Sequence, residues 1–324
     1  MSMTRAELQD AARQAFGDRS RDAETTWQLI GEMGWLMMTV PEALGGLGLG
    51  TEAAAVIHNE LGRALVPGPA IAQMLVIEAL CATGGRAGRD VLLAEAMAGR
   101  VMTTSLAGRG NANLTCIPDA DRASHLLLVD SGRVSLVLLD GAILTARETW
   151  DKTRRLFDVA LDGPEALVIA EGDAAAALSE RLEAQLLLAL AGDSLGGADA
   201  ILSITIDYLK MRRQFDRPLA MFQALKHRVA DMKTRLAAAE ALYWVRAGVE
   251  SVPLAEIGAL KALATGVYRT IAEEAVQLHG GIGLTIEHEC HLFLKRALLN
   301  CALGGDADRH EERAGRHFLA TTPG

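Results

Sequence analysis

Apolar residues recur every three or four positions through the beginning and the end of the chain, but not through its middle. Residues 1–98 have this helical spacing, which returns at 173–324. Residues 99–172 instead contain short aliphatic runs bounded by Gly, Asp or Pro, as strands are. The clearest runs are 124–130, 133–140 and 156–162. We therefore predict a mainly α protein with a small β domain: an N-terminal helical domain (1–98), a middle β domain (99–172) and a C-terminal four-helix bundle (173–324).

Four long helices are predicted in the C-terminal part. The first runs from about Asp173 to Arg213, the second begins near Phe222, the third begins at Pro253, and the fourth follows a Gly-Gly-Ile-Gly turn. Short connections between them predict an antiparallel bundle. The second helix has a continuous apolar stripe, formed by Leu225, Val229, Met232, Leu236, Ala239 and Tyr243. On the fourth, one face is expected to carry Cys290, Leu294, Ala297 and Cys301.

Composition and charge narrow the class of protein. Half of the residues are apolar and only 4% are aromatic, which favours close packing of helices over a β-sandwich. The formal net charge is −9 with dispersed Lys and Arg, which argues against nucleic-acid binding. The 4 cysteines have no CxxC spacing and the N-terminus has no apolar signal region, so we expect a reduced, metal-free, cytoplasmic protein. The longest apolar run, 186–191, is far shorter than the ~20 residues of a membrane span.

The first candidate ligand-binding segment follows the first of the long helices. It contains Arg212, Phe215 and Gln223. The planar fork of an arginine offers paired donors to a diphosphate, and a nearby aromatic ring and amide can hold the two nucleoside halves. Taken alone, the same residues suit an ordinary solvated helix end.

The second candidate segment ends the third long helix and contains Gln277, Gly280 and Gly281. Two adjacent glycines let a backbone approach a ligand closely, and a following helix N-terminus favours anions. A glycine is also the commonest helix C-cap, and the two roles are compatible.

The segment 287–291 contains His288, Cys290 and His291, which together could suggest a metal site. The sequence is one residue short of the zinc-protease spacing, and Cys290 falls on the predicted apolar stripe. We therefore expect no metal here.

The two candidate segments, within 212–232 and 277–297, resemble the C-terminal helical domain of the acyl-CoA dehydrogenase family. Residues 33–50 and 60–69 resemble the N-terminal domain of the same family. The resemblance implies an FAD site shared across a subunit interface, to which this chain contributes a clamp. The clamp residues implied are Arg212, Phe215, Gln223, Gln277, Gly280 and Gly281. Asp216 stands where the family pattern has glycine.

The family removes an α-proton from an acyl-CoA thioester with a glutamate, while hydride passes from the β-carbon to flavin. The two family positions for that glutamate fall on Gly304 and Arg213, so neither offers a carboxylate. The catalytic base is therefore unknown from the sequence. Glu240 or Glu287 could serve as a relocated base, although each sits where helix-surface acids normally do.

The β domain also departs from the family pattern. The loop that lines the flavin ring in family members, Thr-Glu-Pro-x-x-Gly-Ser-Asp, corresponds to residues 103–116, which lack that motif, and no Lys-x-x-Ile-Thr segment follows. Some bacterial members are α2β2 complexes whose shorter β subunit completes the FAD site of a full-length partner. The chain resembles such a β subunit, which implies activity only with a partner, an acyl-CoA substrate and an electron-transfer flavoprotein as acceptor.

Two other interpretations stay open. One is a homo-oligomeric acyl-CoA dehydrogenase with a relocated base. The other is a flavin-free helical interaction protein, against which the retained clamp residues speak.

Overall fold

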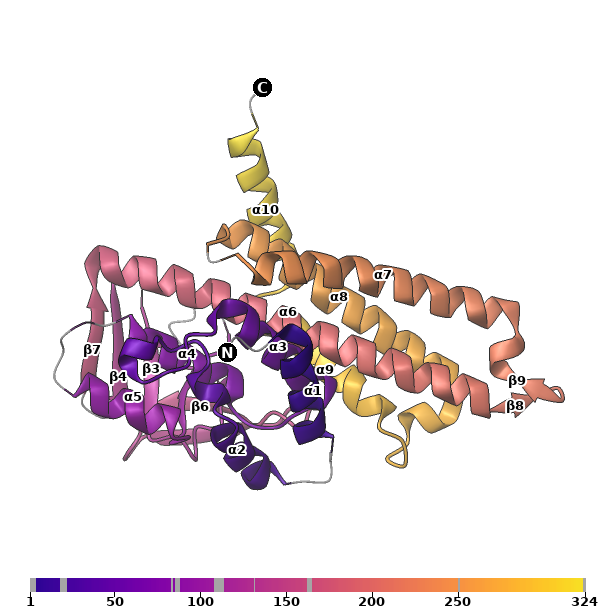
Figure 1. The fold of residues 1–324 in the computed structure, drawn as a ribbon, viewed down its shortest axis with the longest axis horizontal. Coiled ribbons are helices and arrows are strands. Elements are labelled where there is room, and N and C mark those ends of the chain that lie inside the picture. Colours follow the sequence, from indigo (N-terminus) through magenta and orange to yellow (C-terminus); the bar gives the residue numbers. More distant parts are fainter. Residues whose placement is uncertain are drawn as a thin grey trace.

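The computed structural model describes residues 4–17, 22–82, 84, 88–107, 114–130, 132–161, 165–249 and 251–322. Helical domains at both ends of the chain flank a small β domain, as predicted (Figure 1). The helices are α1 (Arg5–Phe16), α2 (Ala23–Glu32), α3 (Gly50–Arg63), α4 (Ala70–Cys81), α5 (Arg89–Met97), α6 (Gly172–Met211), α7 (Gln223–Ala247), α8 (Leu254–His279), α9 (Cys290–Ala302) and α10 (Ala307–Thr321). The 3-10 turns are η1 (Trp35–Met37), η2 (Glu42–Leu44), η3 (Leu219–Met221) and η4 (Gly280–Leu284).

The β domain contains two small sheets. The strands are β1 (Met102–Thr104), β2 (Ile117–Pro118), β3 (His125–Val129), β4 (Arg133–Leu138), β5 (Ile143–Arg147), β6 (Leu156–Ala160) and β7 (Glu165–Glu171). One sheet has the order β1-β3-β4-β7 with only β1 and β3 parallel, and the other has the order β2-β6-β5. The three predicted strands are confirmed as β3, β4 and β6. The sequence analysis missed β5 because its residues are mostly exposed and lack an apolar run.

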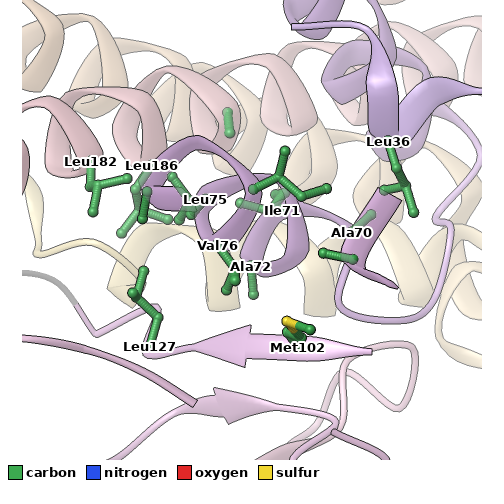
Figure 2. Packing of buried hydrophobic residues seen from close by; sticks show 14 of the residues in the cluster. Leu36, Ala70, Ile71, Ala72, Leu75, Val76, Met102, Leu127, Leu182 and Leu186 are labelled. Atoms are coloured by element: carbon green, nitrogen blue, oxygen red, sulfur yellow. The ribbon is translucent and has the colours of Figure 1, made fainter. Parts of the chain in front are cut away.

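The four-stranded sheet lies against the helices rather than against solvent. Leu127 of β3 and Met102 of β1 face Leu75 and Val76 of α4, and Leu182 of α6 closes the same core (Figure 2). Figure 1 shows that α6 runs the length of the molecule, from β7 to the hairpin of β8 (Arg213–Gln214) and β9 (Arg217–Pro218). This one helix therefore joins the β domain to the far end of the bundle.

Close approach to α6 depends on glycine. A Cβ placed on Gly196 would lie 1.8 Å from the carbonyl oxygen of Asn59 in α3, so only glycine lets the two helices cross there. By length and composition α6 could cross a membrane, since an 18-residue window has a mean hydropathy of 1.4. However, 78% of that window is buried inside the protein, as in a core helix. The sequence analysis did not identify this segment as long and apolar enough to cross a membrane, because it considered only uninterrupted runs of apolar residues.

The predicted stripe of α7 is confirmed, with its members buried or half-buried against the bundle. On the expected face of α9, Cys290 and Ala297 are buried, and Leu294 and Cys301 are half-buried. The buried face also includes Arg296 and Asn300, which the sequence analysis did not expect. Periodicity of apolar residues could not reveal this, because two of the buried positions are polar.

Arg296 is the centre of a buried group of charges that joins three parts of the chain. Its Nε lies 2.6 Å from Asp151 Oδ2 in the β5–β6 loop, and its Nη1 lies 3.2 Å from Asp193 Oδ1 in α6. Arg154 lies 2.6 Å from the same Asp193 oxygen, and Asn300 Nδ2 donates to the other at 2.7 Å. The four charges balance, which is the condition under which a buried ionic group is tolerated.

Burial alone would raise the pKa of the Asp193 carboxyl, but the attraction of Arg154 and Arg296 outweighs it and holds that pKa below 3.8. The pKa of Asp151 is likewise lowered, chiefly by Arg296 against the effect of burial. Both carboxyls therefore stabilise the fold above the ordinary carboxyl pKa, and this contribution is lost as the pH falls through their lower folded values.

Arg296→Met should destabilise the protein by about 3–5 kcal/mol at neutral pH, because it leaves two carboxylates buried with one cation. Urea unfolding monitored by circular dichroism measures the change. The difference in free energy of unfolding between wild type and variant should decrease as the pH falls, since protonation of Asp151 and Asp193 removes the charges that Arg296 neutralises. Arg316→Met, in an exposed pair with Glu312, is the control and should leave stability unchanged. If Arg296→Met lost no more stability than this control, the role of Arg296 in neutralising the two buried carboxylates would be contradicted.

Candidate functional site

The two candidate clamp segments lie at the same end of the bundle, where α6 and α8 both finish (Figure 1). Arg212 is the C-cap residue of α6 and its backbone N–H donates to Tyr208 O at 2.8 Å. Its side chain is exposed, and it forms no ion pair within the described part of the chain. Gln223 is exposed as the first residue of α7. The helix ends thus present a cation and an amide to the outside.

A two-residue turn projects from this end. Phe215 and Asp216 connect β8 to β9, and both have positive φ, +53° and +61°. This is the geometry of a type I′ hairpin turn, which asparagine and glycine adopt readily and phenylalanine does not. The glycine expected from the family pattern would fit the αL conformation of Asp216 without strain. Phe215 is 85% exposed at the tip, and its ring meets the ring of Phe222 edge-on, with 6.2 Å between ring centroids.

The second segment presents bare backbone. Gly280 caps α8 with φ +67°, and neither Gly280 nor Gly281 has any atom within 4 Å of the position where a Cβ would stand. Gln277 is exposed one turn earlier. The space above these peptides is open, as a backbone that receives a ligand requires.

A contact that the sequence analysis missed joins the two segments. Tyr208 of α6 donates from its hydroxyl to the carbonyl of His279 at 3.2 Å and stacks on the His279 ring at 4.4 Å. The two segments are about 70 residues apart in sequence, and neither Tyr208 nor His279 belongs to an apolar pattern or a charge pattern. Only the crossing of α6 and α8 brings them together.

The first position expected for a base is filled by apolar side chains. Gly304 has φ +72°, and a Cβ there would lie 2.9 Å from Leu187 Cδ2 and 3.0 Å from Leu190 Cδ1. Its N–H donates to Leu106 O at 2.8 Å, and buried Lys261 donates to Gly305 O at 2.6 Å. The turn is therefore held on both sides, and a side chain at residue 304 would crowd two leucines of α6.

The other three candidate base positions are Arg213, Glu240 and Glu287. Arg213 is exposed, and its guanidinium donates to Asp216 O at 2.7 Å within the hairpin. Glu240 is half-buried in α7, and burial followed by the charge of Asp199 raises its pKa. Glu240 lies 17 residues from Gln223 along one helix, which is about 25 Å. Glu287 is exposed near the end of the η4 segment.

Among the described residues no group of three potential ligands could hold a metal ion, which includes His288, Cys290 and His291. Cys290 is buried, and burial raises the pKa of its thiol to about 12. It therefore acts as a small apolar side chain, in agreement with its predicted place on the inner face of α9.

The part of the β domain that corresponds to the flavin-ring loop, 103–116, lies in part outside the described residues, since 108–113 are not among them. The N-terminal segment 33–50 borders an apolar cavity between α3, α4 and α6. Met38, Ala55 and Leu188 are among its lining residues, and its volume is only about 50 Å³. Ligand pockets for small molecules usually have roughly 300–1,000 Å³.

Comparisons with known proteins agree with this architecture. Residues 2–100 match the family model described as "Acyl-CoA dehydrogenase, N-terminal domain", and residues 186–319 match "Acyl-CoA dehydrogenase, C-terminal domain". The chain is 34% identical over 287 residues to acyl-CoA dehydrogenase IpdE2 of Mycobacterium tuberculosis, a match that covers 86% of this chain and 82% of that protein.

Solved structures are similar over the whole chain. The Tcur3481-Tcur3483 steroid ACAD variant has a TM-score of 0.86 at 27% identity, with 98% of each chain covered. The ChsE4-ChsE5 complex from Mycobacterium tuberculosis has a TM-score of 0.86 at 23% identity, with 100% of each chain covered, which is a likeness of fold.

Gly304→Glu should lower the free energy of unfolding by about 1–3 kcal/mol, because a side chain with positive φ is strained and must displace Leu187 and Leu190. Thermal unfolding measures the loss. Gly266→Ala is the matched control: it lies inside α8, nothing stands within 4 Å of its Cβ position, and it should lose no stability. Equal stability of Gly304→Glu and wild type would mean that the site is roomier than described.

Proposed function

The chain belongs to the acyl-CoA dehydrogenase family, and we propose that it is the subunit that completes the FAD site of a full-length partner without supplying a base. The reaction of the assembly is the α,β-dehydrogenation of an acyl-CoA thioester. The observation that carries the proposal is the glycine at the expected base position: Gly304 has no carboxylate, its φ is +72°, and a Cβ there would crowd Leu187 and Leu190.

The clamp residues fit the cofactor in charge and in access. Exposed Arg212 offers a charge-assisted contact to a diphosphate, and Gly280 and Gly281 leave their backbone accessible to the same group. Gln223 and Gln277 supply amides on either side. The FAD, when bound, accepts hydride from the substrate β-carbon.

The role of this chain follows from what its residues can do. Arg212 and the glycine backbone bind and orient the diphosphate, and the apolar tip at Phe215, 85% exposed, is covered by the partner's surface. The α-proton is taken by a carboxylate of the partner, because a positioned base is indispensable for so weak an acid. The cavity between α3, α4 and α6, with a volume of about 50 Å³, is too small for an acyl chain, and we assign substrate binding to the partner.

Pairing with a different chain is supported by the Tcur3481-Tcur3483 relative, whose name joins two gene products. The same relative is described as a steroid ACAD, which favours a CoA thioester of a steroid side chain over that of a simple fatty acid. We further propose a cytoplasmic enzyme, an α2β2 assembly and an electron-transfer flavoprotein as the acceptor.

One observation favours a second candidate, a homo-oligomer whose base has moved to Glu240. The raised pKa of that carboxyl is a property of many general bases. Burial of the carboxyl, followed by the charge of nearby Asp199, gives the raised pKa a structural explanation instead. Turnover of an acyl-CoA by the partner-free chain, abolished by Glu240→Gln, would establish this candidate and refute the first.

Arg212→Ala should weaken FAD binding by the assembled enzyme by about 1.5–3 kcal/mol, the usual contribution of a hydrogen bond to a charged group. Its folding stability should hardly change, because the side chain is exposed. Flavin retained after dialysis is the measurement. The control is Lys210→Ala, which removes an exposed cation two residues earlier, paired with Asp207. Equal retention in the two variants would count against the diphosphate contact.

The flavin content of the assembly should approach one FAD per two chains. This chain supplies a clamp but lacks the sequence elements that hold the flavin ring, so each unlike pair contains one finished site. Flavin released by denaturation is quantified by absorbance against total protein. The chain purified alone should bind no stoichiometric flavin and turn over no acyl-CoA. A ratio of one FAD per chain would contradict the proposal that this chain completes the FAD site of a different partner.

A further inference from the structure

The two halves of the clamp belong to different helices, so their spacing must be fixed by something between α6 and α8. Arg212 ends α6 and Gly280 ends α8. A diphosphate that touches both needs them at a constant separation. A displacement of even 1 Å at such a contact weakens a charge-assisted hydrogen bond markedly.

Tyr208 touches both halves. Its own carbonyl accepts the backbone N–H of Arg212 at 2.8 Å, one turn further along. Its hydroxyl donates to the carbonyl of His279, the residue directly before Gly280, at 3.2 Å. The hydroxyl therefore ties α6 to the residue at which α8 ends and η4 begins.

Two histidine rings hold the tyrosine ring in place. The His279 ring stacks on it with 4.4 Å between centroids and 26° between planes, and the His288 ring lies 4.4 Å beyond His279. His279 Nδ1–H donates to the carbonyl of Ala275 at 2.7 Å, which fixes the ring orientation. The other neighbour of that nitrogen is the thiol of Cys290 at 3.8 Å. The stack is thus anchored from α6, α8, α9 and the segment after η4.

We propose that Tyr208 is a positioning residue for the flavin diphosphate: it sets the distance between the Arg212 cation and the Gly280–Gly281 backbone. The inference rests on the proposed function, because it concerns the same FAD site. Tyr208 itself need not touch the cofactor.

The test compares two Tyr→Phe variants of this chain, each purified as a complex with a tagged full-length partner. Tyr208→Phe keeps the ring stack and removes the bond to the His279 carbonyl. Tyr243→Phe is the matched control, since its hydroxyl donates to the Ala55 carbonyl at 2.9 Å and its ring contacts Trp244, far from the clamp along α7. Each loses one hydrogen bond from a tyrosine to a backbone carbonyl.

The measurement is the dissociation constant of FAD, read from quenching of flavin fluorescence, together with the unfolding midpoint of each variant. We expect FAD binding about three- to tenfold weaker in Tyr208→Phe, the loss that one hydrogen bond corresponds to. Tyr243→Phe should bind FAD as wild type does, although it is destabilised. A purely structural Tyr208 would behave as Tyr243 does, and equal FAD affinity in the two variants overturns the proposal.

Arg212→Ala separates the two possible failures. If Arg212→Ala weakens FAD binding while Tyr208→Phe does not, the result supports the clamp assignment and refutes the positioning role of Tyr208. If neither variant alters FAD binding, the clamp assignment itself is wrong, and with it the proposed function.

Discussion

The structure depends on one buried set of charges, in which Arg296 bridges Asp151 and Asp193 while Arg154 and Asn300 complete it. It joins the β5–β6 loop, α6 and α9, which are parts of the chain that share no local sequence contact. Apolar packing alone would let a sheet slide over helices, because dispersion and burial are nondirectional. A balanced group of buried charges has one satisfied arrangement, so it fixes how the β domain sits on the bundle.

That arrangement has a consequence at the C-terminal side of α9. Arg296 lies two turns before Gly304, so the charges that hold α9 against α6 also determine where its last turn ends. The Gly304 N–H then reaches Leu106 in the β domain, and Lys261 holds the next carbonyl from α8. Gly304 therefore lies where the β domain and the C-terminal bundle pack together, and not on the open surface.

Much of the fold could be predicted because its signals are local. The stripe of α7 has the period of a helix, and β3 and β4 are short aliphatic runs bounded by turn residues. The charge cluster and the Tyr208–His279 contact could not be predicted, since each pairs residues far apart whose types suit many other roles. The clamp residues were identified through family resemblance, and their FAD contacts stay predictions. The crowding that a side chain would meet at residue 304 depends on how α6 packs against this turn, and no sequence pattern predicts that.

The surroundings of Gly304 also bear on which substitutions this turn can accept. A Cβ at this position would crowd Leu187 and Leu190, and glycine is the residue that tolerates the positive φ there. An acid introduced at residue 304 alone would combine backbone strain with crowding against α6. A change at α6 that relieves the crowding would leave the strain of the positive φ in place, so the two costs are removed only by separate changes.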